Sequence, residues 1–506
     1  MGARPLPDPR RDGFDEGPAR FDKWLEIGCG RRIGAAMIMP LLLAAAASAQ
    51  GAAPAPTPLR TIAGQVSEQR LRETVQRLVS FGTRHTLSPR GSRTRGIGAA
   101  LDWTQAEFGR ISRACGGCLT IVRPGDTVTN RRIPTPTLVE NVVAIQRGTG
   151  DPNRVVIITG HIDSRVTDVM NATADSPGAN DDGSGTAAVI EAARVLSRHR
   201  FAGTIVYAAL SGEEQGLVGG RILADYARAQ GWQVEANLNN DIVGNSCGSD
   251  GTCDDAHVRV FSEGLRWQGG DQIRAQVRSL GGENDSPSRN LSRFLDTLAD
   301  ELRIGLDVRQ VWRNDRFGRG GDHTEFLNAG FPAVRFSVAV ENYDWQHQDL
   351  RTEGGKVYGD TIDHMDFPYL RKVTQLNVAA LAAMARAPMP PEVTVEGAVS
   401  NDTKLTWHVM PGATGYIVRW RRTDSANWEH SQRVNMENRV IITSCRVACP
   451  GLVGRIEETL AGVRVDDWVF GVSSVSADGS ESPVASAVPG GAFRPVPPPA
   501  PAPAGQ

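Results

Sequence analysis

Two short runs of apolar, largely β-branched residues lie on either side of a helical pattern near the middle of this 506-residue chain. Val155–Thr159 and Thr204–Leu210 have the composition of strands that are buried on both faces. Between them, Ser184–Ser197 repeats apolar residues at the spacing of an α-helix. The pattern therefore predicts a strand, a helix and a second strand, which together form a βαβ unit.

Strand-like and helix-like patterns continue to alternate on both sides of this unit. Further strands are expected at Asn141–Gln146, Glu235–Val243 and Ala333–Val338, and further helices at Ser67–Phe81, Thr94–Phe108 and Tyr369–Met384. The segment Gly244–Gly282 has only weak periodicity, and we expect loops and insertions there. The alternation predicts an α/β fold, with a mixed, largely parallel sheet covered by helices on both faces.

Beyond the proline-rich segment Ala387–Pro391, which we expect to be a stiff linker, the apolar pattern changes to a period of two. Strands are expected at Lys404–His408, Gly415–Trp420, Arg439–Thr443 and Asp467–Ser476. Short strands over about 100 residues predict a small all-β sandwich domain, with Trp407, Tyr416 and Trp420 in its core. Leu405–Trp407, Gly415–Trp420 and Val469–Val472 resemble parts of a fibronectin type III domain.

The N-terminal segment has the features of an export signal. Arg31 and Arg32 precede an apolar stretch, Ile33–Ala47, and Ala47-Ser48-Ala49 fits a cleavage site. The polar leader of about 30 residues is long for a signal peptide; a start codon assigned too far upstream would explain it, and a cytoplasmic leader is the alternative. Because the apolar stretch is short for a bilayer and is interrupted by Pro40, we expect cleavage rather than an uncleaved anchor. The mature protein would then have no stable membrane span and would be periplasmic or secreted.

Together these patterns divide the chain into five parts. They are a leader and signal peptide (1–49), a linker (50–60), the α/β domain (61–387), the β-sandwich (392–490) and a proline-rich disordered tail (491–506). Hydrophobic residues make up 40% of the chain and charged residues 22%, as in globular proteins. The net charge of −2 gives no reason to expect a nucleic-acid partner.

Six of the seven cysteines form three close pairs, which are Cys115/Cys118, Cys247/Cys253 and Cys445/Cys449. In an exported protein, close pairs are most simply disulfides that staple loops. Cys115 and Cys118 also fit a redox or zinc CxxC motif. However, the sequence lacks both the strand-to-helix context of a redox pair and the second ligand pair of a zinc site, so we expect disulfides.

Side chains that can bind a metal gather where the predicted strands of the α/β domain end. They are His161, Asp163, Asp181, Glu213, Glu214, Asp241 and His347. Each has an ordinary explanation by itself, such as a helix N-cap for Asp181 or an exposed acidic pair for Glu213 and Glu214. Their joint position at the strand ends of one sheet, where α/β proteins bind ligands, favours a metal site.

Several of these residues belong to short stretches that form a specific combination. The stretches are Gly160–Ser164, Gly178–Gly185, Glu213–Leu217, Asn240-Asp241, Asp322-His323 with Phe326, and His347 with Asp349. In this combination, residues 66–387 resemble the co-catalytic zinc aminopeptidases, a family that also contains glutamate carboxypeptidases and glutaminyl cyclases. Ser80–Thr86 also looks like an N-terminal stretch seen in bacterial members, so we expect an exported bacterial member of this family.

The resemblance implies a zinc exopeptidase fold and two zinc ions. Asp181 would bridge the ions, His161 and Asp241 would complete one site, and Glu214 and His347 would complete the other. Two zinc ions carry four positive charges and the three carboxylates only three negative ones. The remaining positive charge should acidify a water that bridges the ions and should polarise a substrate carbonyl.

The resemblance also assigns the proton chemistry, which the sequence alone leaves open between two neighbouring glutamates. Glu213 would be the general base, and Asp163 would orient the imidazole of a metal-bound histidine. His364 is a weaker alternative to His347 as the last ligand. His323 is expected to be structural, and Tyr343 is a weak candidate for holding the substrate carbonyl.

We therefore expect an exported dizinc aminopeptidase that acts on peptides with a free N-terminus, through a zinc-bridging water and Glu213. A carboxypeptidase or another amidohydrolase on the same dizinc core is the alternative. A glutaminyl cyclase is disfavoured because such enzymes use one zinc ion and this chain keeps both sites. A hypothesis of another class is a catalytically inert surface-binding protein, in which the sandwich is the functional part. The sequence leaves open whether the sandwich docks on the α/β domain, binds cell-surface polymers or acts as a spacer.

Overall fold

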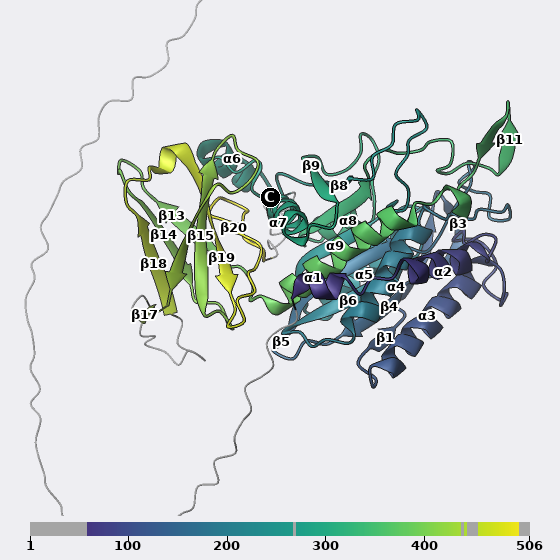
Figure 1. Cartoon of the computed structure of the whole chain (residues 1–506), viewed down its shortest axis with the longest axis horizontal. Coiled ribbons are helices and arrows are strands. Elements are labelled where there is room, and N and C mark those ends of the chain that lie inside the picture. The colour runs from purple at the N-terminus through teal and green to yellow at the C-terminus, as the bar shows by residue number, and fades with distance from the viewer. Residues whose placement is uncertain (1–57, 267–269, 437–439, 443–453, 495–506) are drawn as a thin grey trace, which may run out of the picture. The chain divides into compact units, whose positions relative to one another are not determined.

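A mixed eight-stranded sheet forms the centre of the computed structural model, which describes residues 58–266, 270–436, 440–442 and 454–494 (Figure 1). The sheet consists of β1 (Thr120–Val122), β4 (Val142–Gln146), β5 (Asp151–His161), β6 (Gly203–Leu210), β7 (Gln233–Asn240), β8 (His257–Ser262), β9 (Asp307–Val311) and β10 (Ala333–Val338). Their order is β1-β4-β6-β5-β7-β10-β8-β9, and the four central strands β6, β5, β7 and β10 are parallel. The predicted α/β class is confirmed.

Helices cover both faces of the sheet. The described helices are α1 (Leu59–Ala63), α2 (Glu68–Val79), α3 (Gly96–Ala114), α4 (Gly183–Leu196), α5 (Val218–Ala229), α6 (Gly270–Leu280), α7 (Pro287–Leu302), α8 (His323–Asn328) and α9 (Phe367–Arg386), with a 3-10 turn at Ile362–His364. Of these, α6 lies beside the sandwich instead of the sheet (Figure 1). Among these described helices, none combines the length and the apolar run that crossing a membrane would require.

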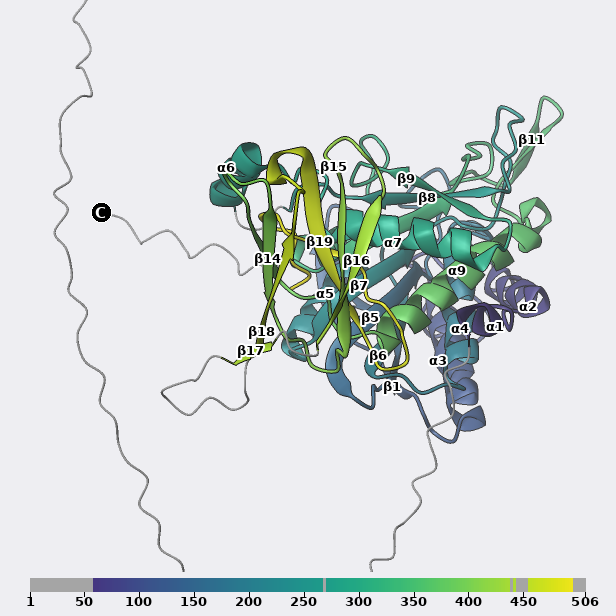
Figure 2. The same ribbon diagram turned by 60° about the vertical axis from the view of Figure 1, so that its left-hand side comes forward.

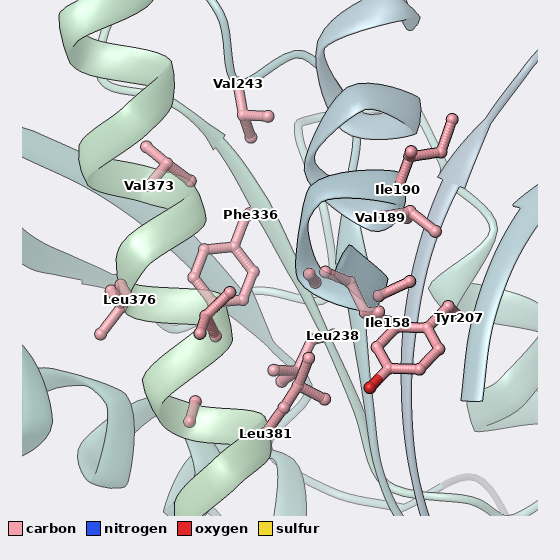
Figure 3. Packing of buried hydrophobic residues seen from close by; sticks show 14 of the residues in the cluster. Ile158, Val189, Ile190, Tyr207, Leu238, Val243, Phe336, Val373, Leu376 and Leu381 are labelled. Carbon is pink, nitrogen blue, oxygen red and sulfur yellow. The ribbon is translucent and has the colours of Figure 1, made fainter. Parts of the chain in front are cut away.

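The alternation of side chains along the central strands explains why both faces need covering. In β5, Val156 and Ile158 pack into one core with residues of α4 and α9, whereas Val155 and Ile157 pack into a second core with residues of α5 and α8. Figure 3 shows the first core, in which side chains of α4 and α9 meet those of four central strands. A strand that is buried on both sides reads as a continuous apolar run, as the sequence predicted.

One segment of the α/β part has more secondary structure than the sequence predicted. The segment 244–282, which was expected to form loops, contains strand β8 and helix α6. Strand β8 alternates half-buried residues, His257 and Arg259, with buried Val258 and Val260, and it pairs with β10 and β9. A strand of only six residues that includes charged side chains has a weak apolar pattern. Pairing with the neighbouring strands, rather than the local sequence, therefore determines that this segment forms a strand.

Two smaller antiparallel sheets follow the α/β part and lie face to face (Figure 2). One contains β13 (Val393–Glu396), β14 (Thr403–His408), β17 (Val440–Ile442) and β18 (Gly454–Leu460), and the other contains β15 (Gly415–Arg422), β16 (His430–Asn435), β19 (Trp468–Val475) and β20 (Ala485–Ser486). Trp407 and Tyr416 are buried between the two sheets with their ring centroids 5.4 Å apart, whereas Trp420 is partly exposed and stacks on His430. The fibronectin type III resemblance stays a prediction.

Smaller elements complete the described chain. Two hairpins, β2–β3 (Gly125–Asn130 and Ile133–Glu140) and β11–β12 (Arg351–Glu353 and Lys356–Tyr358), stand outside the sheets. Disulfides join Cys115 to Cys118 and Cys247 to Cys253. The third predicted pair, Cys445/Cys449, lies outside the described residues, as do the predicted signal peptide and most of the tail.

A buried ionic cluster joins α7 to the sandwich. It comprises Asp285, Asn290, Arg293, Arg421 and Ser486, and we call it the seam cluster. Asp285 accepts hydrogen bonds from Arg421 at 2.7 and 2.8 Å and from Ser486 at 2.9 Å. Arg293 lies 3.9 Å from the same carboxylate and donates to the carbonyl of Ala426 at 2.5 Å. These contacts tie the two parts together within one compact unit.

Candidate metal centre

Five predicted ligands lie together at the carboxyl ends of the parallel strands. His161 is the last residue of β5, Glu214 follows β6, Asp241 follows β7, and Asp181 and His347 lie in the loops after β5 and β10. Their donor atoms form two groups that share Asp181, one with His161 and Asp241 and the other with Glu214 and His347. We call these five residues the cleft cluster. The parallel arrangement explains the convergence, because it brings all of these strand ends to one edge of the sheet.

The shared carboxylate of Asp181 lies between the two histidines. Its Oδ1 atom is 3.1 Å from Nε2 of His161, and its Oδ2 atom is 2.8 Å from Nε2 of His347. On the outer sides, Asp241 lies 3.9 Å from Nε2 of His161, and Glu214 lies 2.9 Å from Nε2 of His347. One carboxylate therefore presents a different oxygen to each half of the cluster, as a bridging metal ligand does.

The turn before α4 frees Asp181 for this position. The helix N-cap is the next residue, Asp182, which accepts hydrogen bonds from the backbone N–H groups of Gly185 at 2.9 Å and of His161 at 2.8 Å. A Cβ atom on Gly185 would lie 2.1 Å from the carbonyl oxygen of Asn240, so only glycine permits this approach of helix and strand. The N-cap explanation thus applies to Asp182 and leaves the carboxylate of Asp181 to face the cleft.

Asp163 organises the loop that carries both glutamates. Its carboxylate accepts hydrogen bonds from the backbone N–H groups of Glu213 at 3.3 Å and Glu214 at 3.1 Å, and from the hydroxyl of Thr86 at 3.2 Å. Its backbone carbonyl accepts a hydrogen bond from Nδ1 of His161 at 3.1 Å, whereas its carboxylate is 3.6 Å away. The proton on Nδ1 leaves Nε2 of His161 free to bind a metal.

Glu213 lies beside the cleft cluster but outside both ligand groups. Its side chain is partly exposed, and it lines the same cavity as Asp181, Glu214 and Asp241. Burial raises the pKa of Glu213 well above its usual range, and the negative charges of Glu214 and Asp241 add to this. A carboxylate with a raised pKa at the wall of a cavity is suited to accept and return a proton.

The charges and donor atoms of the cleft cluster fit a cation. Although burial lowers the pKa of His347, the negative charges of Glu214 and Asp181 outweigh it and raise that pKa to about 10. The Oε1 atom of buried Glu214 lies 2.9 Å from Nε2 of His347, so both donor atoms face the same point. Imidazole nitrogens and carboxylate oxygens are the donors that zinc commonly takes, so the residues present fit two zinc ions. Their role as zinc ligands stays a prediction.

Buried and partly buried arginines surround the cleft, and no sequence pattern predicted them. Arg84 is fully buried and donates to the carbonyls of Ile162 at 2.6 Å and Gly178 at 2.8 Å, which fixes the loops on both sides of the cluster. Arg335 lies 2.8 Å from Asp241, and Nε of Arg165 donates to Glu214 at 2.8 Å. A buried guanidinium compensates carboxylates, but its position depends on contacts between distant segments and leaves no spacing in the sequence.

The other histidines considered as ligands lie outside both groups. His323 is buried at the start of α8, and its Nε2 atom bonds to the carbonyl of Asn314 at 3.0 Å. His364 stacks on Trp345 with ring centroids 4.0 Å apart, and its Nδ1 atom bonds to the carbonyl of Gly359. Tyr343 is 59% exposed and lines a neighbouring cavity that contains none of the cleft cluster, which removes the reason to assign it to the substrate carbonyl.

Near the cleft, several residues have a positive φ angle, a backbone conformation that residues other than glycine rarely adopt. Three such residues lie beside it: Leu217 with φ 58°, Ile242 with φ 55° and His347 with φ 58°. Within the described residues, only Arg303 and Val399 share this feature elsewhere. Positive φ values at β-branched Ile242 and at His347 require support from the surrounding packing, and such positions gather at functional sites.

Comparisons with known proteins agree on one family. Residues 141–381 match the sequence pattern of peptidase family M28. A Leptosphaeria maculans protein named "Probable zinc metalloprotease" is 42% identical over 437 residues, which cover 85% of this chain and 97% of the relative. A Pyricularia oryzae protein of the same name is 42% identical over 443 residues, which cover 85% and 84%. Both sources are fungal, so the predicted bacterial membership is not supported.

Among solved structures, the LapA aminopeptidase of Legionella pneumophila is similar to 65% of this chain and covers 74% of its own. The sequence identity is 18% and the TM-score is 0.48.

Proposed function

This chain belongs to peptidase family M28, and from that premise we propose that it is an exported dizinc aminopeptidase that acts on peptides with a free N-terminus. The position of Asp181 supports the proposal most directly, because each of its carboxylate oxygens faces one histidine, at 3.1 and 2.8 Å. His161 and Asp241 would hold one ion with it, and Glu214 and His347 the other. When bound, the zinc ions would supply Lewis-acid polarisation and lower the pKa of water.

The protein's own residues would carry the remaining steps. Glu213 would take the proton of the attacking water and return it to the leaving amine, which its raised pKa favours. Asp163 would hold the loop so that Glu213 acts as the base and Glu214 as a ligand, because its carboxylate accepts hydrogen bonds from the backbone N–H groups of both residues. Arg84 would hold the loops that present His161 and Asp181.

The test separates the general base from the bridging ligand. In Glu213→Gln, we expect two zinc ions per chain to remain and hydrolysis of aminoacyl anilides to fall by about a hundred- to ten-thousandfold, the range of general-base catalysis. In Asp181→Ala, we expect zinc itself to be lost. Metal analysis and steady-state kinetics measure both, and Glu353→Gln, on an exposed hairpin, is the control. Unimpaired hydrolysis by both variants would refute the proposal.

A carboxypeptidase on the same dizinc core is the second candidate, and the arginines that line the cavity beside the cluster favour it. N-acetylated peptides separate the two activities, because an aminopeptidase should reject them. Location is part of the proposal as well: the apolar stretch Ile33–Ala47 and the cleavage pattern after it support export to the periplasm or secretion.

A further inference from the structure

A cavity of about 300 Å³ opens beside the cleft cluster, and its walls carry more cationic side chains than the zinc chemistry requires. Four arginines line it: Arg132, Arg165, Arg316 and Arg319. The acidic side chains in the same wall are Asp181, Glu213, Glu214 and Asp241. Three of those four are proposed ligands, and two zinc ions would more than balance their charge. The loaded cavity is therefore positively charged.

Arg132 is the arginine with the least compensation. It lies at the tip of the β2–β3 hairpin, where its NH1 atom donates to the backbone carbonyl of Glu214 at 2.7 Å. No carboxylate in the described ranges forms an ion pair with it. Its neighbour Arg131 is exposed and does not line the cavity. The hairpin thus holds one guanidinium group at the cavity wall with its charge unneutralised.

A second excess of positive charge surrounds Glu341 and comes from strand β8 and the loop before α8. Arg259, Arg316 and Arg319 all contact one buried carboxylate, that of Glu341, at 2.7, 3.4 and 2.7 Å. Arg316 and Arg319 also line a second cavity of about 550 Å³, so this group connects the two spaces. Glu341 can neutralise only one of the three guanidinium groups, although Asp315 also contacts Arg316.

We propose that the peptides cleaved at this site carry a carboxylate that is bound by Arg132 and Arg319. The inference rests on the proposed function and names its substrate class. A guanidinium group matches a carboxylate through two parallel hydrogen bonds, and a positively charged cavity strengthens the attraction. The carboxylate could belong to an acidic side chain next to the scissile bond or to the C-terminus of a short peptide. Both sources present the same chemistry.

Four matched tripeptides distinguish these sources on the zinc-loaded, full-length enzyme. They combine Glu or Gln as the first residue of X-Ala-Ala with a free or an amidated C-terminus. If a side chain is recognised, Glu is preferred over Gln by about tenfold or more in kcat/KM even when the C-terminus is amidated. If the C-terminus is recognised, the free acid is preferred whatever the first residue.

Variants assign the preference to a residue. In Arg132→Gln the ratio of the anionic to the neutral peptide should fall to about one, whereas Arg131→Gln, at the same hairpin tip, should keep it. Added salt should reduce the ratio in the wild type, because partly exposed charges are screened. Equal rates for all four peptides, or an unchanged ratio in Arg132→Gln, would overturn the inference while leaving the peptidase proposal intact.

A binding measurement keeps the inference testable if no peptide is cleaved, an outcome that would count against the peptidase proposal instead. Calorimetric titration of glutarate into the zinc-loaded protein should show binding that is about tenfold weaker in Arg132→Gln and unchanged in Arg131→Gln. The neutral diamide of glutarate should not bind. Equal affinity of glutarate for the wild type and Arg132→Gln would overturn the inference.

Discussion

The cleft cluster and the seam cluster are both buried and both ionic, yet they carry opposite excesses of charge. In the cleft cluster, carboxylates outnumber fixed cations, and they raise the pKa of His347 to about 10. In the seam cluster, Arg293 and Arg421 share Asp285, and burial lowers the pKa of Arg293 to about 10. Imidazole exchanges its proton for a metal, whereas a guanidinium with a pKa of about 10 stays charged at neutral pH.

The surroundings reinforce this difference. The cleft cluster borders a cavity, and four of its five members line the cavity wall: Asp181, Glu214, Asp241 and His347. The Asp285 and Arg421 side chains of the seam cluster are 3% and 1% exposed, and they bond to each other across two segments of the chain. A buried ionic group whose carboxylates outnumber the permanent cations beside them, and which faces a cavity, indicates a binding site. One that contains its counter-charge and is enclosed indicates a structural joint.

Removal of metal should show the largest difference between the roles of the two clusters. We expect a chelator to reduce hydrolysis at least about a thousandfold and zinc to restore it, since metal stabilisation of the transition state amounts to several kcal/mol. Zinc should also raise the melting temperature, because it binds only the folded cluster. Calorimetry and steady-state kinetics on the same samples measure both effects.

The seam variant Asp285→Ala serves as the matched control for this experiment. Its melting temperature should still rise on addition of zinc, whereas that of Asp181→Ala should not. If Asp181→Ala responded to zinc as the wild type does, the cation would lie elsewhere, and the contrast between the clusters would be lost.

Breaking the seam cluster should destabilise the protein without affecting the metal. Asp285→Ala leaves the Arg421 and Arg293 side chains buried without their counter-charge, and such a change costs about 3–5 kcal/mol of unfolding free energy. Zinc content and kcat of the folded protein should stay as in the wild type. Denaturant unfolding, metal analysis and kinetics at low temperature provide the three measurements.

An exposed pair in the same domain supplies the comparison for the seam. Asp424 lies 3.5 Å from Arg422, and its side chain is 80% exposed, so Asp424→Ala should change the unfolding free energy by less than about 1 kcal/mol. A similarly small change in unfolding free energy for Asp285→Ala would mean that burial does not strengthen the seam cluster. The interpretation of this cluster as a structural joint would then be wrong.

The sequence predicted the α/β part well where one face or both faces of an element are apolar. The central strands β5, β6, β7 and β10 appear within a few residues of their predicted positions. It missed β1, β8 and β9 of the main sheet, the hairpin strands β2, β3, β11 and β12, and in the sandwich β13, β16, β18 and β20. Strand β16 has mostly polar residues with only Val434 buried, so its identity depends on pairing with β15 rather than on its own pattern.

For the candidate site, motif residues were predictable and their supports were not. The five members of the cleft cluster stand in recognisable stretches at strand ends, and the structure brings them together. Arg84, Arg165 and Arg335 contact this region from three distant segments, with no common spacing. Arg132 is likewise placed by a hairpin that packs on the Glu214 loop, a tertiary contact that local patterns do not encode.

The buried pair of Arg154 and Glu235 has one charge of each sign, so it sharpens the comparison of the two clusters. Changing it should have the smallest effect on the unfolding free energy. Arg154 donates to Glu235 at 3.0 Å and also to the carbonyl of Met384 at the end of α9. The other carboxylate oxygen of Glu235 is buried without a partner, and burial raises the pKa of Glu235 from 4.5 to about 7. Balance of charge alone therefore does not offset the cost of burying this carboxylate.

The sign of the pH effect follows from this raised pKa. The folded state binds the proton of Glu235 more tightly than the unfolded state, so the stability that it contributes is fully present below the unfolded pKa of 4.5. That contribution is lost as the pH rises through about 7, by up to about 3 kcal/mol. Glu235→Gln removes the titration, and the difference between its unfolding free energy and that of the wild type should grow in favour of the variant from about pH 5 to about pH 8.

Taking the difference between two proteins cancels the titration of every other group, including those of the cleft cluster. Glu353→Gln, at an exposed carboxylate, should give a difference that does not depend on pH. If the curve for Glu235→Gln were equally flat, the buried pair would hold its charges at no cost. Charge balance, rather than the hydrogen bonding of each oxygen, would then decide which buried ionic groups of this protein are stable without a ligand.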